Sequence, residues 1–74
     1  MKVEPGDLIL DKNMNRTLTV LSVEKVPHIG YANTNFYYDE IQYMDSKEEQ
    51  GKINKVYEYE LDSWNGIELI KANK

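Results

Sequence analysis

Two pairs of closely spaced carboxylates are the residues of this sequence best suited to acid–base chemistry. Asp39 and Glu40 are adjacent, and Glu58 and Glu60 are two residues apart. A general acid needs burial or a close like charge that holds its proton near neutral pH. Glu58 and Glu60 would lie about 7 Å apart on one face of an exposed strand, which supplies neither condition. We therefore interpret both pairs as part of a solvated face.

The sequence offers few residues suited to nucleophilic catalysis or to metal binding. His28 is the single histidine, and it follows Pro27 in a segment that we expect to be a loop. A nucleophilic triad needs a histidine beside a serine or threonine, and no serine lies in a recognisable nucleophile motif. The sequence has no cysteine, and it lacks a calcium-loop, histidine-pair or glycine-rich phosphate motif. We expect no catalytic residue, no metal and no cofactor, and hence no enzyme.

The aromatic residues are the stronger functional signal. Six tyrosines, one phenylalanine and one tryptophan exceed the needs of so small a core. We expect Tyr57, Tyr59 and Trp64 to fill the core or its rim. Tyr37 and Tyr38 are adjacent, so on a strand they point to opposite faces and at least one is exposed. Exposed tyrosine is typical of interface hot spots. The predicted protein-binding surface comprises Tyr31, Phe36, Tyr37, Tyr38, Asp39 and Glu40.

The net charge of −4 is unevenly distributed. Residues 1–38 carry four acidic and four basic side chains, whereas residues 39–62 carry eight acidic side chains and three lysines. An acidic surface repels phosphate and suits a basic protein surface. The charge thus favours a protein partner with a basic surface and disfavours nucleic acid, although solubility alone also explains it.

The elements that must position these residues are organised around the stretch 16–26. Leu18 and Val20 alternate with threonines, which is the two-residue period of a half-buried strand. The adjacent pair Val20 and Leu21 then shifts the apolar positions by one, so we expect a bulge or a bend at this point. Pro27 has no N–H group and is expected to end the strand.

Further strands are expected on both sides of this central one. Turn-forming residues separate the apolar runs, and Gly66 suits the left-handed end of a helical turn. The predicted elements are a strand at 8–10, a turn at 11–15, a loop at 27–35, a strand at 36–44, a turn at 45–52, a strand at 53–61, one 3₁₀ turn at 62–66 and a strand at 67–70.

The length of 74 residues indicates one domain spanning 1–74. No apolar run reaches the roughly 20 residues of a membrane span, and the N-terminus lacks the apolar centre of a signal peptide. We expect a cytoplasmic protein that does not enter a membrane. The abundance of Asn, Lys, Ile and Tyr, which have A/T-rich codons, points to a low-GC bacterial or phage genome.

Two sequence segments carry a resemblance to a known superfamily. Pro5-Gly6-Asp7 before the strand at 8–10, followed by Val20-Leu21-Ser22-Val23, resembles the opening of KOW-type and Tudor-type SH3-like barrels. The resemblance implies an all-β, five-stranded SH3-like small barrel that binds rather than catalyses. The acidic-aromatic loop of signalling SH3 domains and the basic loop of ribosomal KOW domains are missing, so neither ligand class is implied.

These observations favour a non-enzymatic protein-binding module, a phage or bacterial accessory or regulatory protein that acts on a basic or nucleic-acid-handling partner. One alternative is a barrel that stacks single-stranded bases on its aromatic rings, with Lys12, Arg16 and Lys25 at the phosphates. Others are an acidic mimic of a nucleic-acid duplex, and a subunit that completes the sheet of a larger assembly. The sequence leaves the oligomeric state open.

Overall fold

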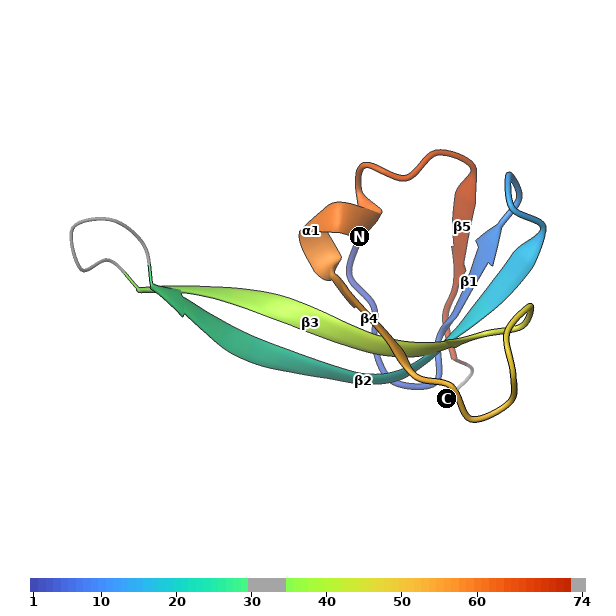
Figure 1. The fold of residues 1–74 in the computed structure, drawn as a ribbon. Coiled ribbons are helices and arrows are strands. Elements are labelled where there is room, and N and C mark those ends of the chain that lie inside the picture. The colour runs from blue at the N-terminus through green and yellow to red at the C-terminus, as the bar shows by residue number, and fades with distance from the viewer. Residues whose placement is uncertain (30–34, 73–74) are drawn as a thin grey trace.

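A computed structural model describes residues 1–29 and 35–72 of the chain and confirms the all-β class. Five strands form one antiparallel sheet, and the described residues contain a single helical turn (Figure 1). The elements are β1 (Leu8–Asp11), β2 (Arg16–Ile29), β3 (Asn35–Asp45), β4 (Asn54–Tyr57), α1 (Glu58–Leu61) and β5 (Ile67–Ile70).

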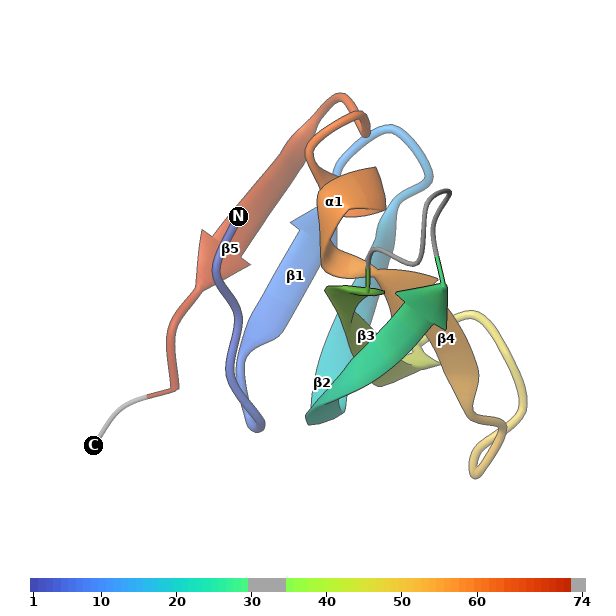
Figure 2. The ribbon, with the colours of Figure 1, turned by 90° about the vertical axis from the view of Figure 1, so that its left-hand side faces the viewer.

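The strand order is β4-β3-β2-β1-β5, so the sheet is curved but not closed. The expected closed barrel is therefore not what the described residues form, because β4 and β5 are its two edges and do not pair with each other. Each of them is only four residues long. Figure 2 shows α1 across the open side, between the β5 and β4 edges of the sheet.

A β-bulge interrupts β2 where the apolar pattern slips. Val20 lies opposite Tyr43, and Ser22 lies opposite Gln42, so Leu21 is an extra residue in the ladder. Val20 is buried, Val23 packs against the core, and Leu21 is exposed. The predicted bulge is confirmed, and it keeps apolar residues on the core face on both sides of the slip.

The expectation that Pro27 ends the central strand is wrong. β2 continues to Ile29 and pairs with β3 from Leu18 to that end, with Pro27 opposite Tyr37 and His28 opposite Phe36. The segment 27–35, expected to be a loop, is therefore strand at both ends. Residues 30–34, which include Tyr31, lie outside the described residues.

The hydrogen-bond alternation of the ladder explains why Pro27 is tolerated. The backbone N–H of Val20 points away from β3, because it donates a hydrogen bond to the Asp7 carbonyl at 2.9 Å. Tyr43, opposite Val20, therefore directs its own backbone groups toward β4. Tyr37 lies an even number of residues from Tyr43 in the same strand, so its backbone N–H and C=O also point away from β2. Pro27 and Tyr37 therefore form a non-hydrogen-bonded pair. A missing N–H leaves the ladder intact there.

The fourth strand is shorter than expected, and the helical turn comes earlier and is α rather than 3₁₀. β4 ends at Tyr57 and α1 follows at once, instead of a 3₁₀ turn at 62–66. The Glu60 carboxylate accepts a hydrogen bond from the Tyr57 N–H at 3.2 Å, which satisfies a free donor at the start of the turn. The turn carries Leu61 into the core. Gly66 has a φ of 73°, so the left-handed conformation expected there is confirmed.

The core lies between the concave side of the sheet, the N-terminal segment and α1. Its buried apolar side chains come from every strand except β5, whose Ile67 and Leu69 pack against them from the edge. Trp64 is half-buried against this core, as expected for a rim residue. The buried set is Val3, Ile9, Leu18, Val20, Ile41, Tyr43, Val56 and Leu61.

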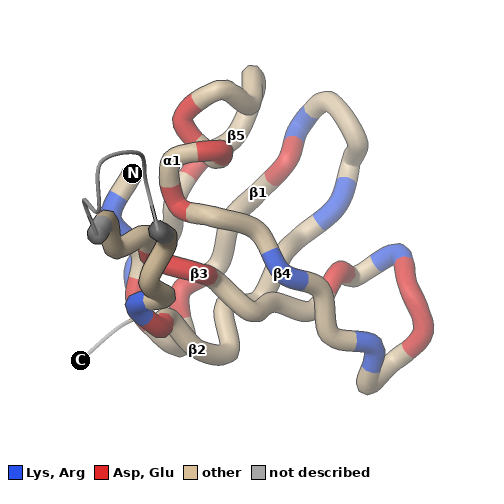
Figure 3. Tube along the Cα trace, turned by 60° about the vertical axis from the view of Figure 1, so that its left-hand side comes forward, with Lys and Arg blue, Asp and Glu red and all other residues tan. Residues whose placement is uncertain are grey.

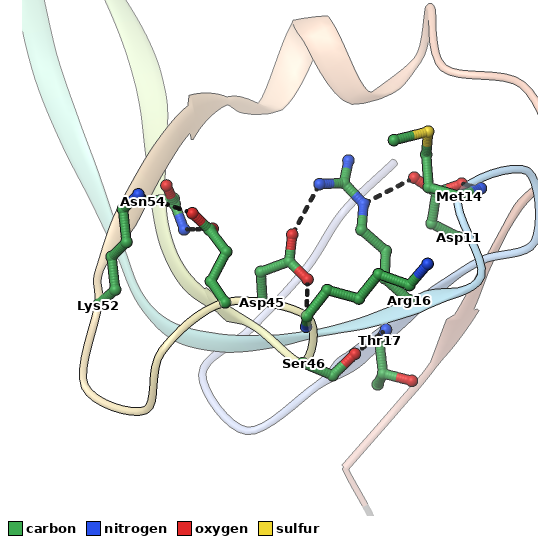
Figure 4. A network of polar contacts seen from close by, with 10 residues as sticks. Asp11, Met14, Arg16, Thr17, Asp45, Ser46, Lys52 and Asn54 are labelled. Carbon is green, nitrogen blue, oxygen red and sulfur yellow. Dashed lines mark hydrogen bonds and ion pairs between the residues drawn. The ribbon is translucent and has the colours of Figure 1, made fainter.

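A buried ion network joins the β1–β2 turn to the end of β3 (Figure 4). Arg16 donates from Nε to Asp11 at 2.9 Å and from a terminal nitrogen to Asp45 at 2.8 Å. The side chains of Asp11 and Asp45 are only 6% and 5% exposed. The guanidinium also lies 5.5 Å from the centre of the Trp64 ring, so this network fixes the turn end of the sheet.

A third buried carboxylate, Asp7, holds the chain ends together. Asp7 is almost fully buried and accepts hydrogen bonds from the N–H groups of Glu4 and Ala72, both at 2.8 Å. The Lys71 ammonium lies 2.8 Å from the same carboxylate. These bonds lower the pKa of Asp7 to about 2, with the Lys71 hydrogen bond as the largest cause.

Residues 24–29 of β2 and 35–40 of β3 form a two-stranded arm that projects from the rest of the sheet (Figure 1). β1 pairs only with residues 16–19 of β2, and β4 pairs only with residues 40–43 of β3, so Glu40 marks the base of the arm. The arm makes the molecule elongated, at 42 × 27 × 24 Å.

Candidate functional site

The described members of the predicted protein-binding surface all lie on the arm. Phe36, Tyr37 and Tyr38 are 48%, 65% and 37% exposed, and Asp39 and Glu40 are half-buried. Because neighbouring residues alternate, Tyr37 and Asp39 occupy one face of the arm, and Phe36, Tyr38 and Glu40 occupy the other. The sequence located the exposed aromatic segment, but the structure divides it between two faces. Tyr31 cannot be assigned to either face, because it lies outside the described residues.

Tyr38 belongs to a ring cluster that the sequence analysis missed. His28, Tyr38, Tyr57 and Tyr59 form this cluster, from β2, β3, β4 and α1 respectively. The His28 ring lies edge-on, 4.7 Å from Tyr38 and 5.2 Å from Tyr57 between ring centres. Tyr59 lies 5.0 Å from Tyr38 and stacks on Tyr57 at 5.5 Å. Such spacings are those of favourable aromatic pairs.

Two expectations about these rings are corrected. Tyr59 is 55% exposed rather than part of the core or its rim, because the chain turns into α1 after Tyr57 instead of continuing as a strand. His28 lies half-buried among rings on a strand rather than in a loop. Little in the sequence signals this helix start, because Tyr57 stands at the position where Ser, Thr, Asp or Asn is typical.

A cleft of about 280 Å³ lies between the arm and α1. We call it the arm cleft. Its walls combine tyrosine rings with carboxylates and one lysine, and they come from β2, β3, α1 and the residue after α1. The lining residues are Lys25, Tyr37, Tyr38, Asp39, Glu58, Tyr59 and Asp62.

Glu58 is the unusual carboxylate of the arm cleft. Burial raises its pKa, and Asp39 raises it further, because only the protonated form of Glu58 can donate a hydrogen bond to Asp39 and because the Asp39 charge disfavours ionisation. The Oε2 atom of Glu58 is buried and accepts a hydrogen bond from no donor in the described chain. The interpretation of Glu58 as part of a solvated face is therefore wrong, since α1 turns this residue toward β3.

The other charged groups around the arm form ion pairs at or near the protein surface. The Lys2 ammonium lies 3.7 Å from Asp39, and the Lys55 ammonium lies 3.8 Å from Glu40. The N-terminal ammonium donates to Asp62. Figure 3 shows acidic residues in α1 and in the neighbouring part of β3, so the base of the arm is a mainly acidic region.

Other kinds of site find little support in the described residues. Residues 1–29 and 35–72 contain no group of three or more His, Asp or Glu side chains placed to hold a metal ion. Arg16, named above as a phosphate contact, is engaged by Asp11 and Asp45. No helix within the described parts of the chain is long and apolar enough to cross a bilayer.

Comparison of the chain with protein-family models, curated proteins and solved structures found no match. The fold and the site together define a small, five-stranded antiparallel protein with an exposed aromatic arm and an acidic cleft beside it.

Proposed function

We propose that this protein is a non-enzymatic protein-binding module on an open variant of the SH3-like small barrel. The strand order β4-β3-β2-β1-β5 supports the fold assignment, as does a helical turn placed between the last two strands. The Pro5-Gly6-Asp7 turn that leads into β1 is a further point of resemblance.

The exposed aromatic arm is the observation that carries the proposal. Phe36 and Tyr37 expose about half or more of their surface to solvent, on a part of the arm that pairs with neither β1 nor β4. Isolated two-stranded ribbons are only marginally stable in water, and tyrosine is among the residues enriched in interface hot spots. A partner that covers the arm would bury these rings and stabilise the ribbon.

The charge around the arm selects the kind of partner. Acidic residues outnumber basic ones across the arm base and α1, which favours a partner with a basic surface. Proteins that handle nucleic acid commonly have such surfaces. Together with the codon-linked composition, this supports an accessory or regulatory role in a bacterium or phage.

A pull-down with matched variants tests the proposal. Tagged wild-type protein, the arm variant Phe36→Ala/Tyr37→Ala and the control Met14→Ala/Ile53→Ala are each incubated with nuclease-treated bacterial lysate. Met14 and Ile53 are also exposed apolar residues, but they lie outside the arm. We expect a stoichiometric protein to be retained by the wild type and the control and lost with the arm variant. Equal retention by all three proteins would contradict a binding role for the arm.

Single-stranded nucleic acid is the second candidate, because the exposed Phe36 and Tyr37 rings are able to stack on bases. A gel shift with short single-stranded oligonucleotides at low salt tests it. We expect no shift, because the arm base is acidic and Arg16 is held by two carboxylates. A shift lost in Phe36→Ala/Tyr37→Ala would favour this second function over the first.

A further inference from the structure

The arm cleft has a wall composition that suits one kind of ligand group. Tyr37 and Tyr38 of β3 and Tyr59 of α1 supply ring surfaces, and Asp39, Glu58 and Asp62 supply carboxylates. Aromatic rings attract cations through the negative charge of their faces, and carboxylates attract them directly. Both parts of the lining therefore point to a cationic group.

Glu58 and Asp39 lack a hydrogen-bond donor between them. Both side chains are acceptors when ionised, and Oε2 of Glu58 is buried with no partner in the described chain. A buried acceptor without a donor is costly. The arrangement is completed either by a proton shared between the two carboxyl groups or by a cationic donor that enters the cleft.

The protein's own cations do not fill this position. Lys2 forms an ion pair with Asp39 at 3.7 Å and acts on Glu58 only through space, and its side chain is 80% exposed, so both interactions are weak and easily displaced. The N-terminal ammonium is bonded to Asp62. Lys25 lines the cleft but makes no ion pair with Asp39 or Glu58 within 4.0 Å. Of the three carboxylates in the cleft, Glu58 is therefore the one without an ion pair in the described chain, and in this sense its charge is unmatched.

We propose that the arm cleft binds the guanidinium group of an arginine side chain that the partner protein presents. A planar guanidinium stacks on tyrosine rings and offers several donors in a fork, which allows it to serve two carboxylates at once. A lysine ammonium is compact and more strongly hydrated, so it suits ring walls less well. This inference rests on the proposed function, since it assigns a contact to the partner of that same arm.

Titration with single-residue probes tests the inference on the full-length, ¹⁵N-labelled protein. The probes are the N-acetyl methylamides of arginine, lysine and citrulline, the last of which keeps the shape of arginine but has no charge. We expect saturable shifts of the backbone amides of Asp39, Glu58 and Tyr59 with arginine, weaker shifts with lysine and none with citrulline. Equal shifts with arginine and citrulline would overturn the inference.

Matched variants locate the binding. Glu58→Gln removes the unmatched charge and keeps the side-chain shape, so the Kd for the arginine probe should rise about tenfold or more. Glu49→Gln, an exposed change on the β3–β4 turn, should leave the Kd unchanged. Tyr59→Leu removes an exposed ring and should also weaken binding, which keeps the inference testable if Glu58→Gln perturbs the fold. An unchanged Kd in both Glu58→Gln and Tyr59→Leu would refute the inference.

The two proposals can fail separately. If the pull-down retains a protein through Phe36 and Tyr37 but the arginine probe does not bind, the protein-binding function stands and the guanidinium site is wrong. If the probe binds in the arm cleft but no protein is retained, the site exists and the proposed function fails.

Discussion

At the scale of single residues, carboxylates that look alike in the sequence acquire opposite properties. Hydrogen bonds from Lys71 and from two backbone N–H groups hold the pKa of Asp7 at about 2. Burial, and next the hydrogen bond to Asp39, raise the pKa of Glu58 above its ordinary value of 4.5. Ionised Asp7 therefore stabilises the fold, and ionised Glu58 destabilises it.

Asp7→Asn should lower the melting temperature at pH 7 by several degrees, because the amide has no negative charge for Lys71 and replaces one of the two accepting oxygens by an NH2 group. The pKa of Asp7 is depressed in the folded state, so its contribution is fully present above the ordinary value of 3.8 and declines as the pH falls toward about 2. The gap between variant and wild type should close over that range in thermal melts followed by circular dichroism. Asp62→Asn, at an exposed carboxylate, should change little; a gap that does not depend on pH would contradict the account.

Glu58→Gln should raise the free energy of unfolding at pH 7 by up to about 1 kcal/mol, the range of partly exposed charge interactions. The folded-state pKa of Glu58 lies above 4.5, so its protonated form is favoured by folding. The penalty for ionising it is absent below pH 4.5 and develops as the pH rises through the folded-state pKa. Urea titrations at pH 4 and pH 7 should show the gain only at pH 7. A variant that is less stable than wild type at both values would show that Glu58 is not destabilising.

At the scale of elements, the bulge in β2 decides which side chains the strand presents. Leu21 is the extra residue, and the pairs on either side of it keep Val20 and Val23 toward the core. Bulges also increase local twist and bend a strand. In this protein the bend separates the part of β2 that pairs with β1 from the part that forms the arm.

Deletion of Leu21 should preserve the fold, because the pairs Val20–Tyr43 and Ser22–Gln42 then become consecutive and no side chain changes face. Deletion of Gln42 should unfold the protein or shift its register, since the bulge then has no matching residue and one end of β3 turns to the wrong face. The dispersion of ¹H–¹⁵N spectra of the two variants checks this. A well-dispersed spectrum for the Gln42 deletion, or a collapsed one for the Leu21 deletion, would contradict the assigned register.

The Arg16 network also acts between elements, because it joins the end of β1 to the end of β3. Arg16→Met should cost about 3–5 kcal/mol, because it leaves Asp11 and Asp45 buried without a positive charge. Adding Asp11→Asn and Asp45→Asn should restore part of the loss. Urea unfolding followed by far-ultraviolet circular dichroism measures both effects. A loss below about 1 kcal/mol, typical of exposed ion pairs, would show that the network is a surface feature.

At the scale of the whole molecule, the compact part of the sheet supports an arm that is remote from the buried networks. The longest dimension of the molecule is 42 Å, and the arm lies at one end of it (Figure 1). The acidic residues of β3 and α1 lie at the base of this arm (Figure 3). A basic partner would meet the aromatic rings and the acidic region together.

Charge reversal at the arm base tests whether the acidic region steers the partner, once that partner has been identified. Asp39→Lys/Glu40→Lys should slow association by about tenfold at low salt and flatten its dependence on salt concentration. The control Glu49→Lys/Glu68→Lys changes the net charge by the same amount at exposed positions outside the arm, and it should slow association much less. Surface plasmon resonance across a salt series gives both rates. Equal slowing by the two variants would mean that net charge, rather than the acidic arm base, steers the partner.

Local patterns in the sequence determined much of the sheet. The alternation of Leu18 and Val20, and the slip at Leu21, predict a strand with a bulge because both depend only on neighbouring residues. The strand at 67–70 and the left-handed Gly66 follow for the same reason. The adjacency of Tyr37 and Tyr38 likewise predicted an exposed aromatic segment.

Only the tertiary structure decided the features that depend on distant partners. Pro27 stays in β2 because the ladder with Tyr37 leaves its N–H position unused, and that depends on the register set at Val20. Tyr59 leaves the core because α1 brings Leu61 inward instead. The sheet stays open because β4 and β5, which are close in sequence, end at opposite edges. The ring cluster and the unmatched Glu58 exist because folding brings α1 against β3, and side chains so far apart in sequence leave no periodic pattern from which their contact could be predicted.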